Sequence, residues 1–321
     1  MQQSCPTQKP TPSKSQPAAY PSSLAADQVV IKVAALAINP ADYMVQSLGD
    51  ALLPFKYPYI LGNDVAGTIV EAGPSAVAAG FKPGDRVLAL TIGSMTPGGG
   101  GFQEYVSVGT DTVAPIPAGV SFAEAAVLPL GFTTAASALY LPGYLGLSLP
   151  TANPPVPAPP KGKNTLLVGA GASSVGSNAI QLARASGYDV FTTCSPQNFA
   201  HCTALGAARV FDYRSASVVE DLVAAFEGRT CAGGFAIFPG SEEMVVEVVA
   251  RVKEGEKMVV CAMAVAAEKK AREDVCVKEM FGGSLRTSGM AGYLYLYHEF
   301  LPEALRTGHY RLSSGQCKIG E

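Results

Sequence analysis

A glycine-rich turn between a buried strand and an amphipathic helix constrains the fold of this chain more than any other feature. Residues 165–168 form a short apolar run that predicts a strand, and residues 175–186 carry apolar side chains at helical spacing. Residues 169–176, between them, read Gly-Ala-Gly-Ala-Ser-Ser-Val-Gly. The N–H groups and dipole of a helix start bind a dinucleotide pyrophosphate where small residues let it approach. Ala172, Ser173 and Ser174 are small enough, so the turn predicts a nucleotide site.

Strand-like and helix-like segments alternate after this turn. We expect further strands at 189–193, 209–212, 234–238 and 257–261, and helices at 199–205, 218–226 and 242–252. Parallel strands need a crossover, which is usually a right-handed helix. The alternation therefore predicts the α/β class, with a doubly wound parallel sheet covered on both faces.

The first part of the chain has a different pattern, of short apolar runs closed by turn residues. Such runs occur at 29–33, 67–71, 85–88 and 102–106, which predicts a β-rich domain resembling a partly open barrel. The proline-rich segment 150–160 predicts a loop between two domains. We expect a disordered tail at 1–23, a β-rich domain at 24–160, a nucleotide-binding domain at 161–311 and an atypical tail at 312–321.

Composition limits the partners and the compartment. A formal net charge of -3 provides no dense basic patch, so we expect no nucleic-acid partner. Seven scattered cysteines indicate a reduced chain, hence a cytoplasmic protein. Residues 125–149 are apolar, but Pro129, Gly131, Pro142 and Gly143 interrupt them, which predicts buried core and no membrane span. We expect a monomer.

The end of the second strand of such a sheet usually selects the nicotinamide cofactor, because an acidic residue there binds the ribose 2'-hydroxyl and repels a 2'-phosphate. Residues 193–198 contain no acid, which favours NADPH, although no Lys or Arg in this turn clamps the phosphate. Ser195 and Asn198 offer donors for it, and they are equally compatible with an ordinary helix cap. Tyr213, after the third strand, either packs on the adenine or fills a crevice.

Four blocks of the β-rich part, at 39–42, 61–70, 81–87 and 101–106, match in order those of the catalytic domain of the medium-chain dehydrogenase/reductase superfamily. The chain resembles this superfamily over nearly its whole length, which implies a GroES-like catalytic domain and a Rossmann domain. Zinc alcohol dehydrogenases carry Gly-His-Glu in the second block, and this chain has Gly62-Asn63-Asp64. The histidines His201, His298 and His309 lie outside these blocks and no cluster of four cysteines occurs, so we expect no metal.

Blocks at 128–135, 193–199 and 206–214 are more specific and resemble the fungal trans-acting enoyl reductases that serve polyketide synthases. The resemblance implies the following cofactor contacts: Ala41, Asp42, Tyr43 and Met44 at the nicotinamide, Ala172, Ser173, Ser174 and Val175 at the phosphates, Ser195, Pro196, Gln197 and Asn198 at the 2'-phosphate, Tyr213 at the adenine, and Ala262 and Met263. It implies these acyl-substrate contacts: Thr134, Ala135, Ala136, Ser137, Ala138, Leu139, Tyr140, Leu141, Thr287, Ser288, Gly289, Met290 and Ala291.

The expected activity is NADPH-dependent reduction of a 2-enoyl thioester, presented by a polyketide synthase. Thr134 and the backbone near Gly289 are candidates for the thioester oxygen, although Thr134 is equally compatible with a plain helix start; the sequence indicates no general acid. An NADPH:quinone reductase and a truncated, non-catalytic homologue are the alternatives. Relatives often carry a lysine at the position of Met44 and continue through further helix and strands after 308–311, so the resemblance also leads us to expect a short C-terminus.

Overall fold

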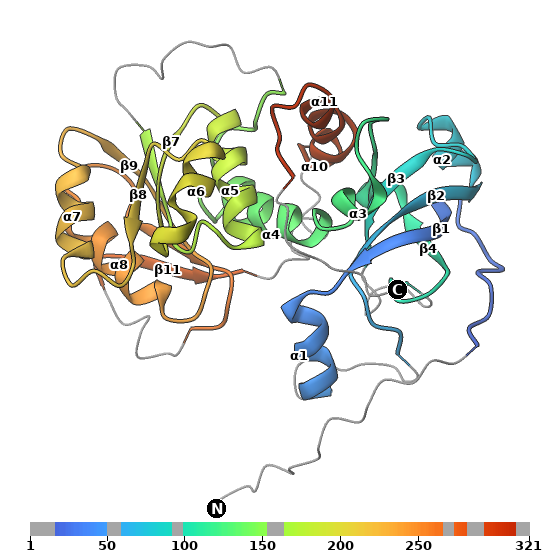
Figure 1. Ribbon diagram of the computed structural model, residues 1–321, viewed down its shortest axis with the longest axis horizontal. Helices are drawn as coiled ribbons and strands as arrows, with labels where there is room; N and C mark the ends of the chain where they lie inside the picture. The colour runs from blue at the N-terminus through green and yellow to red at the C-terminus, as the bar shows by residue number, and fades with distance from the viewer. Residues whose placement is uncertain are drawn as a thin grey trace, which may run out of the picture. The chain divides into compact units, whose positions relative to one another are not determined.

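The computed structural model describes residues 17–49, 59–91, 99–152, 164–265, 273–280 and 292–312. These residues form two compact units that divide after Pro129 (Figure 1). We call them the N-terminal unit and the C-terminal unit. The prediction of a boundary near residue 160 differs from this division, because the helix that follows Pro129 packs within the C-terminal unit.

The N-terminal unit is built on an antiparallel sheet of five strands in the order β4-β1-β2-β3-β5. The strands are β1 (Gln28–Ala37), β2 (Asp64–Ala72), β3 (Arg86–Leu90), β4 (Tyr105–Gly109) and β5 (Val113–Pro115). The helices are α1 (Pro40–Leu48), α2 (Pro74–Ala78), α3 (Phe122–Ala125) and the 3-10 turn η2 (Thr110–Thr112). Fully buried Val29, Ile31 and Val87 belong to its core, so apolar alternation along the strands fixes their register. The expected β-rich domain is confirmed.

The C-terminal unit is built on a parallel sheet of six strands in the order β11-β10-β9-β6-β7-β8. The strands are β6 (Asn164–Val168), β7 (Asp189–Cys194), β8 (Arg209–Asp212), β9 (Thr230–Ala236), β10 (Met258–Cys261) and β11 (Cys276–Glu279). The helices between strands are α5 (Ser174–Ala185), α6 (Phe199–Ala204), α7 (Val218–Ala225) and α8 (Ser241–Arg251), with the 3-10 turn η3 (Pro196–Asn198) before α6. This is the predicted doubly wound sheet; the strand order reverses at β6, which lies between β7 and β9.

The strand β9 begins earlier than the sequence predicts, at Thr230 rather than near residue 234. Gly233 and Gly234 resemble a turn in the sequence, yet both lie inside the strand. A Cβ on Gly234 would lie 2.5 Å from Val245 Cγ1 on α8. The glycine is therefore needed so that α8 can pack closely on the sheet.

The apolar stretch near residue 130 forms one continuous helix, α4 (Pro129–Tyr140), in place of the short pieces predicted. Pro129 stands at its first position, where proline is tolerated because that N–H has no intrahelical acceptor. A Cβ on Gly131 would lie 2.5 Å from Ser174 Oγ and 2.9 Å from Asn178 Nδ2 on α5. The glycine thus allows α4 to approach α5 without ending the helix, and this packing explains why α4 belongs to the C-terminal unit.

One helical stretch among the described residues, Phe122–Tyr140, is long and apolar enough to pass a length and hydropathy test for a membrane span. Of its most apolar window, 72% is buried inside the protein. Core helices satisfy the same test.

The last described segment consists of α10 (Gly292–Tyr295), the π-helical turn η5 (Leu296–Phe300) and α11 (Leu301–Arg306). Its buried side chains pack on α4 and α5. Tyr297 Oη lies 2.6 Å from Thr133 Oγ1, and the Tyr310 hydroxyl donates to Asn178 Oδ1 at 2.5 Å. Arg311 N donates to Gln181 Oε1 at 2.6 Å, and Gln181 Nε2 donates to Arg311 O at 3.1 Å. The segment therefore fixes the middle of α5 through buried polar contacts.

Candidate nucleotide site

The predicted nucleotide-binding residues of the C-terminal unit meet at one edge of its sheet. Residues 169–176 follow β6, residues 195–198 follow β7, Tyr213 follows β8, and Ala262 and Met263 follow β10. The carboxyl ends of parallel strands share an edge, and ligands of open α/β sheets bind in the crevice there, at the point where strand order reverses. The fold therefore gathers these four groups at the expected place.

Residues 169–176 form a tightly closed loop. Ser173 is the N-cap of α5: its Oγ accepts from Gly176 N at 3.0 Å and donates to Ala170 O at 2.7 Å. A Cβ on Gly176 would lie 2.3 Å from Ala170 O, so only glycine fits this close approach. Ala170 itself has φ 61°, in the left-handed region that non-glycine residues rarely adopt. Such local strain is typical of ligand-binding loops.

The same loop leaves backbone donors at the start of α5. The N–H groups of Ala172, Ser174 and Val175 have no hydrogen-bond acceptor among the described residues. Helix starts carry such donors together with a partial positive charge, and both favour an anion. These donors and the small side chains around them fit a dinucleotide pyrophosphate.

Backbone and side-chain contacts tie this loop to the end of β7. Gly171 N donates to Thr193 O at 2.9 Å, and Ala170 N donates to Thr193 Oγ1 at 3.3 Å. A Cβ on Gly171 would lie 2.0 Å from Thr192 Oγ1. The loop after β6 and the turn after β7 are therefore held at a fixed spacing, as two phosphate groups of one ligand require.

The turn after β7 holds Ser195 and Asn198, for which a helix-capping role is the alternative. Neither provides it: Ser195 precedes η3 and Asn198 precedes α6, and neither side chain makes a cap hydrogen bond. Asn198 Nδ2 lies 3.5 Å from Ser195 Oγ, a long contact that leaves both groups able to bind elsewhere. Both are half-buried, and Pro196 and Gln197 are exposed.

Two thiols lie under this turn. Cys194 and Cys202 are buried, with their Sγ atoms 3.6 Å apart. Burial raises the pKa of both thiols, that of Cys202 to about 12, so both are neutral near pH 7. The floor of the turn is consequently uncharged. The five cysteines within the described ranges are all free.

The predicted nicotinamide contacts lie in the N-terminal unit, on α1. Asp42 is buried, and its carboxylate accepts from Asn39 N at 2.8 Å, Asn63 Nδ2 at 2.7 Å and Gly62 N at 3.2 Å. Burial raises the pKa of Asp42, whereas these three donors favour its charged form. Its carboxylate is thus used to join α1 to the segment before β2. Tyr43, in contrast, is 68% exposed and can contact a ligand.

Within the described residues, no group of three or more His, Cys, Asp or Glu side chains could hold a metal ion. Asn63, at the position where zinc alcohol dehydrogenases have their histidine, instead donates to Asp42. An amide nitrogen in that role offers no lone pair to a cation.

Two family models match the chain. Residues 25–118 match the alcohol dehydrogenase GroES-like domain, and residues 174–306 match the zinc-binding dehydrogenase domain. Dehydrogenase pigH of Monascus ruber is 40% identical over 314 residues, covering 89% of this chain and 83% of that protein. The chain belongs to the medium-chain dehydrogenase/reductase superfamily. It is an oxidoreductase with a fold that binds nicotinamide cofactors.

Among other relatives of this superfamily member, trans-enoyl reductase himH of Aspergillus japonicus is 42% identical over 202 residues, covering 62% of this chain and 56% of that protein. Two solved structures share its fold. CurK enoyl reductase has a TM-score of 0.71 at 22% identity, covering 92% of this chain and 85% of that one. Escherichia coli quinone oxidoreductase complexed with NADPH has a TM-score of 0.66 at 20% identity, covering 92% and 84%.

The residues that the resemblance to enoyl reductases assigns to the acyl substrate lie on α4 or outside the described residues. Thr134, Ala135, Ala136, Ser137, Ala138, Leu139, Tyr140 and Leu141 are all buried. Ser137 Oγ donates to Thr133 O, and the Tyr140 hydroxyl donates to Leu182 O. These hydroxyls serve the packing of α4, so the assignment stays a prediction. Thr287, Ser288, Gly289, Met290 and Ala291 lie outside the described residues.

Two exposed side chains at the nucleotide edge have no counterpart in the sequence prediction. Phe238 follows β9, beside the strand-order reversal, and is 66% exposed. Arg214 follows Tyr213 at the end of β8. An exposed aromatic after a strand end was a usable signal for Phe238. Arg214 required the pairing of β7 with β8, which the sequence does not contain.

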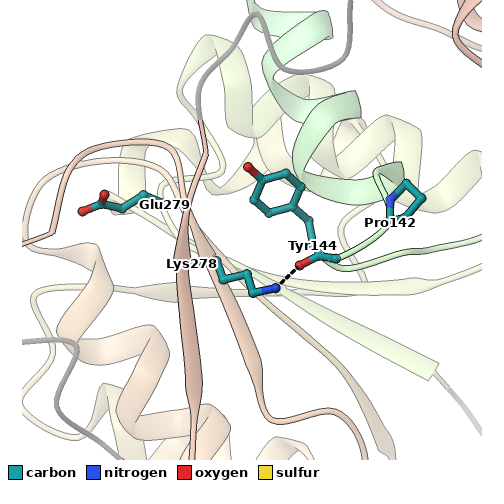
Figure 2. Close-up of a pocket in the computed structure, with 5 residues that line it drawn as sticks. Pro142, Tyr144, Lys278 and Glu279 are labelled. Carbon is teal, nitrogen blue, oxygen red and sulfur yellow. Dashed lines mark hydrogen bonds between the residues drawn. The ribbon is translucent and has the colours of Figure 1, made fainter. Parts of the chain in front are cut away.

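A separate hollow of about 420 Å³ lies in the C-terminal unit between the loop after α4 and β11 (Figure 2). Pro142, Gly143 and Tyr144 line one side, and Lys278 and Glu279 line the other. Lys278 Nζ donates to Gly143 O at 2.7 Å, and Glu279 Oε1 accepts from Val265 N at 2.6 Å. Both charged groups therefore hold loops in place, and the hollow includes none of the predicted nucleotide contacts.

Proposed function

We propose that this oxidoreductase uses NADPH to reduce the carbon–carbon double bond of a 2-enoyl thioester in polyketide biosynthesis. One observation carries the choice of cofactor: the turn after β7 has two uncommitted polar side chains, Ser195 and Asn198, and no acid. An acid at this place would repel a 2'-phosphate. The name of the relative himH, a trans-enoyl reductase, supports the choice of reaction.

In this proposal the chain acts mainly by positioning. Bound NADPH supplies a hydride to the β-carbon of the enoyl group, and a proton is added at the α-carbon. The donors at Ala172, Ser174 and Val175 hold the pyrophosphate, and the turn at Ser195 and Asn198 holds the adenosine end. Holding reactants in place removes much of the entropic barrier, and donors aimed at the thioester oxygen stabilise the enolate. Thr134 and the backbone near Gly289 remain the candidates for that contact.

The partner and the setting are part of the same proposal. The thioester is presented by a polyketide synthase, as the resemblance to trans-acting enoyl reductases implies. The protein acts as a cytoplasmic monomer, without a metal ion, a nucleic acid or a membrane.

A quinone reductase is the second candidate, because Escherichia coli quinone oxidoreductase has the same fold. The full chain should be assayed by NADPH absorbance with a 2-enoyl thioester, such as crotonyl-coenzyme A, and in parallel with a benzoquinone. We expect NADPH consumption with the thioester and a saturated product by mass spectrometry. Turnover with the quinone alone would select the second candidate. NADPH binding without turnover of either would identify a non-catalytic homologue.

A further inference from the structure

The proposed 2'-phosphate site lacks a cation if only the turn after β7 is considered. Ser195 and Asn198 supply neutral donors, and residues 193–198 include no Lys or Arg. A phosphate monoester carries nearly two negative charges near pH 7, and charge-assisted hydrogen bonds to it are about twice as strong as neutral ones. A cation from another element is therefore to be sought at this edge.

The strand register brings Arg214 to the same edge. Cys194 is paired with Asp212 at the ends of β7 and β8, and these neighbouring strands are parallel. Adjacent strands lie roughly 4.8 Å apart, so the residues that follow the two ends emerge side by side. Ser195 is the first residue after β7, and Tyr213 and Arg214 are the first two after β8.

The conformation of Arg214 suits the binding of an anion. Its backbone is fixed, because Arg214 N donates to Asp212 Oδ1 at 3.0 Å. Its guanidinium lies over the ring of Tyr213, 5.2 Å from the centroid, and Tyr213 is 52% exposed. Arginine stacks on aromatic faces and at the same time binds phosphate through its planar fork. A stacked arginine beside an exposed tyrosine matches an adenine ring with a phosphate on the adjoining ribose.

The charge of Arg214 is also not used within the fold. No carboxylate among the described residues forms an ion pair with it, and the Asp212 carboxylate is bound to its backbone N–H. Other arginines of the C-terminal unit do form ion pairs: Arg184 and Arg229 with Asp189, Arg251 with Glu220, and Arg306 with Glu303. Arg214 is exposed, so it can meet a ligand without breaking a buried contact.

We propose that Arg214 is the cation that binds the adenosine 2'-phosphate, that the adenine packs on the Tyr213–Arg214 pair, and that Arg214 determines the preference for NADPH over NADH. This inference rests on the proposed NADPH dependence and adds the residue responsible for it. A merely structural pair of Tyr213 and Arg214 would not distinguish ligands that differ in the 2'-phosphate alone.

The test compares the binding of 2',5'-ADP and 5'-AMP to the full chain by isothermal titration calorimetry. Arg214→Ala should weaken 2',5'-ADP about 10- to 100-fold, the range for loss of a hydrogen-bonded charge, and change 5'-AMP less than about threefold. Arg214→Lys should recover part of the loss, since it keeps the charge without the fork. Tyr213→Ala should weaken both ligands by a similar factor, because it removes only the stacking surface.

Arg251→Ala is the matched control. It also removes one exposed arginine from the C-terminal unit, at the end of α8, and should change neither constant. If the wild-type protein binds 2',5'-ADP no better than 5'-AMP, both the proposed NADPH dependence and this inference fail. If it prefers 2',5'-ADP and Arg214→Ala keeps that preference, or weakens both ligands equally, only this inference fails. Circular dichroism checks that each variant is folded.

Discussion

Gly176 is the residue at which the nucleotide loop tolerates change least. A Cβ there would lie 2.3 Å from Ala170 O and 2.7 Å from Gly171 Cα. Both atoms belong to the backbone of a loop that Thr193 and Ser173 hold from two sides. No side chain can rotate to relieve the overlap. In Gly176→Ala, therefore, the start of α5 must move away from the loop.

Two opposing effects set the size of the change in stability. Alanine in place of glycine inside a helix stabilises it by about 1 kcal/mol. Overpacking of a closed site costs about 1 to 3 kcal/mol, and the rigid backbone favours the upper end of that range. We expect the free energy of unfolding to fall by about 1 to 2 kcal/mol, which lowers Tm by roughly 2 to 8 °C for a unit of this size. The N–H donors of Ser174 and Val175 move with the helix, so NADPH binding should weaken at least about tenfold.

Differential scanning calorimetry and NADPH titration together test this prediction. Gly119→Ala is the matched control, because a Cβ on Gly119 meets nothing within 4 Å. It should leave both Tm and the dissociation constant of NADPH unchanged. If Gly176→Ala is as stable as the wild-type protein and binds NADPH equally well, the close approach of the loop to α5 is not a constraint and our reasoning is refuted.

Three further predictions concern other contacts. Tyr310→Phe should lower the free energy of unfolding by about 1 to 3 kcal/mol in urea titrations, because the buried Asn178 amide loses its partner; an unchanged midpoint would contradict this. Burial raises the pKa of Asp42 above its usual 3.8, so its contribution to stability should fall as pH rises from 3.8 through the folded-state pKa. The stability difference between wild type and Asp42→Asn, measured against pH, should show that trend and not the opposite one. Finally, iodoacetamide should modify exposed Cys276 in the native protein and reach Cys202 only on unfolding, as mass mapping would reveal.

Periodicity carries most of the fold in this sequence. The alternation after residue 165 predicts strands and helices that the structure contains, because each apolar run is closed by a turn residue and is long enough to show its period. Strand β11, Cys276–Glu279, lies at the sheet edge, and its four residues include two charged ones, so it has no apolar run to detect. Strand β5 ends in a proline, which also hides it.

Residues around α4 show where composition misleads. Pro129 and Gly131 are helix breakers in isolation, and their context reverses both roles. Pro129 stands at the helix start, and Gly131 is required by the side chains of Ser174 and Asn178 on another helix. A partner more than 40 positions away cannot be found from local propensity.

The candidate site was predictable as far as it depends on chain order. Each nucleotide contact predicted in the C-terminal unit follows a strand end, and parallel strands necessarily bring those ends together. Arg214 became a candidate only through the pairing of Cys194 with Asp212. Asp42 was assigned to the cofactor, yet its carboxylate accepts three hydrogen bonds inside the N-terminal unit, which no spacing of residues indicates.

The contacts between α5 and the last described segment also bear on the order of folding during synthesis. Asn178 and Gln181 are buried, and their partners Tyr310 and Arg311 lie 132 and 130 residues later. While the ribosome is still making the intervening strands, these amides have water as their only partner, and burying them then would cost about 1 to 3 kcal/mol each. The helix that begins the pyrophosphate loop consequently reaches its final packing only after Arg311 has emerged. Nascent chains should therefore acquire cofactor affinity late, and not when the loop itself is complete.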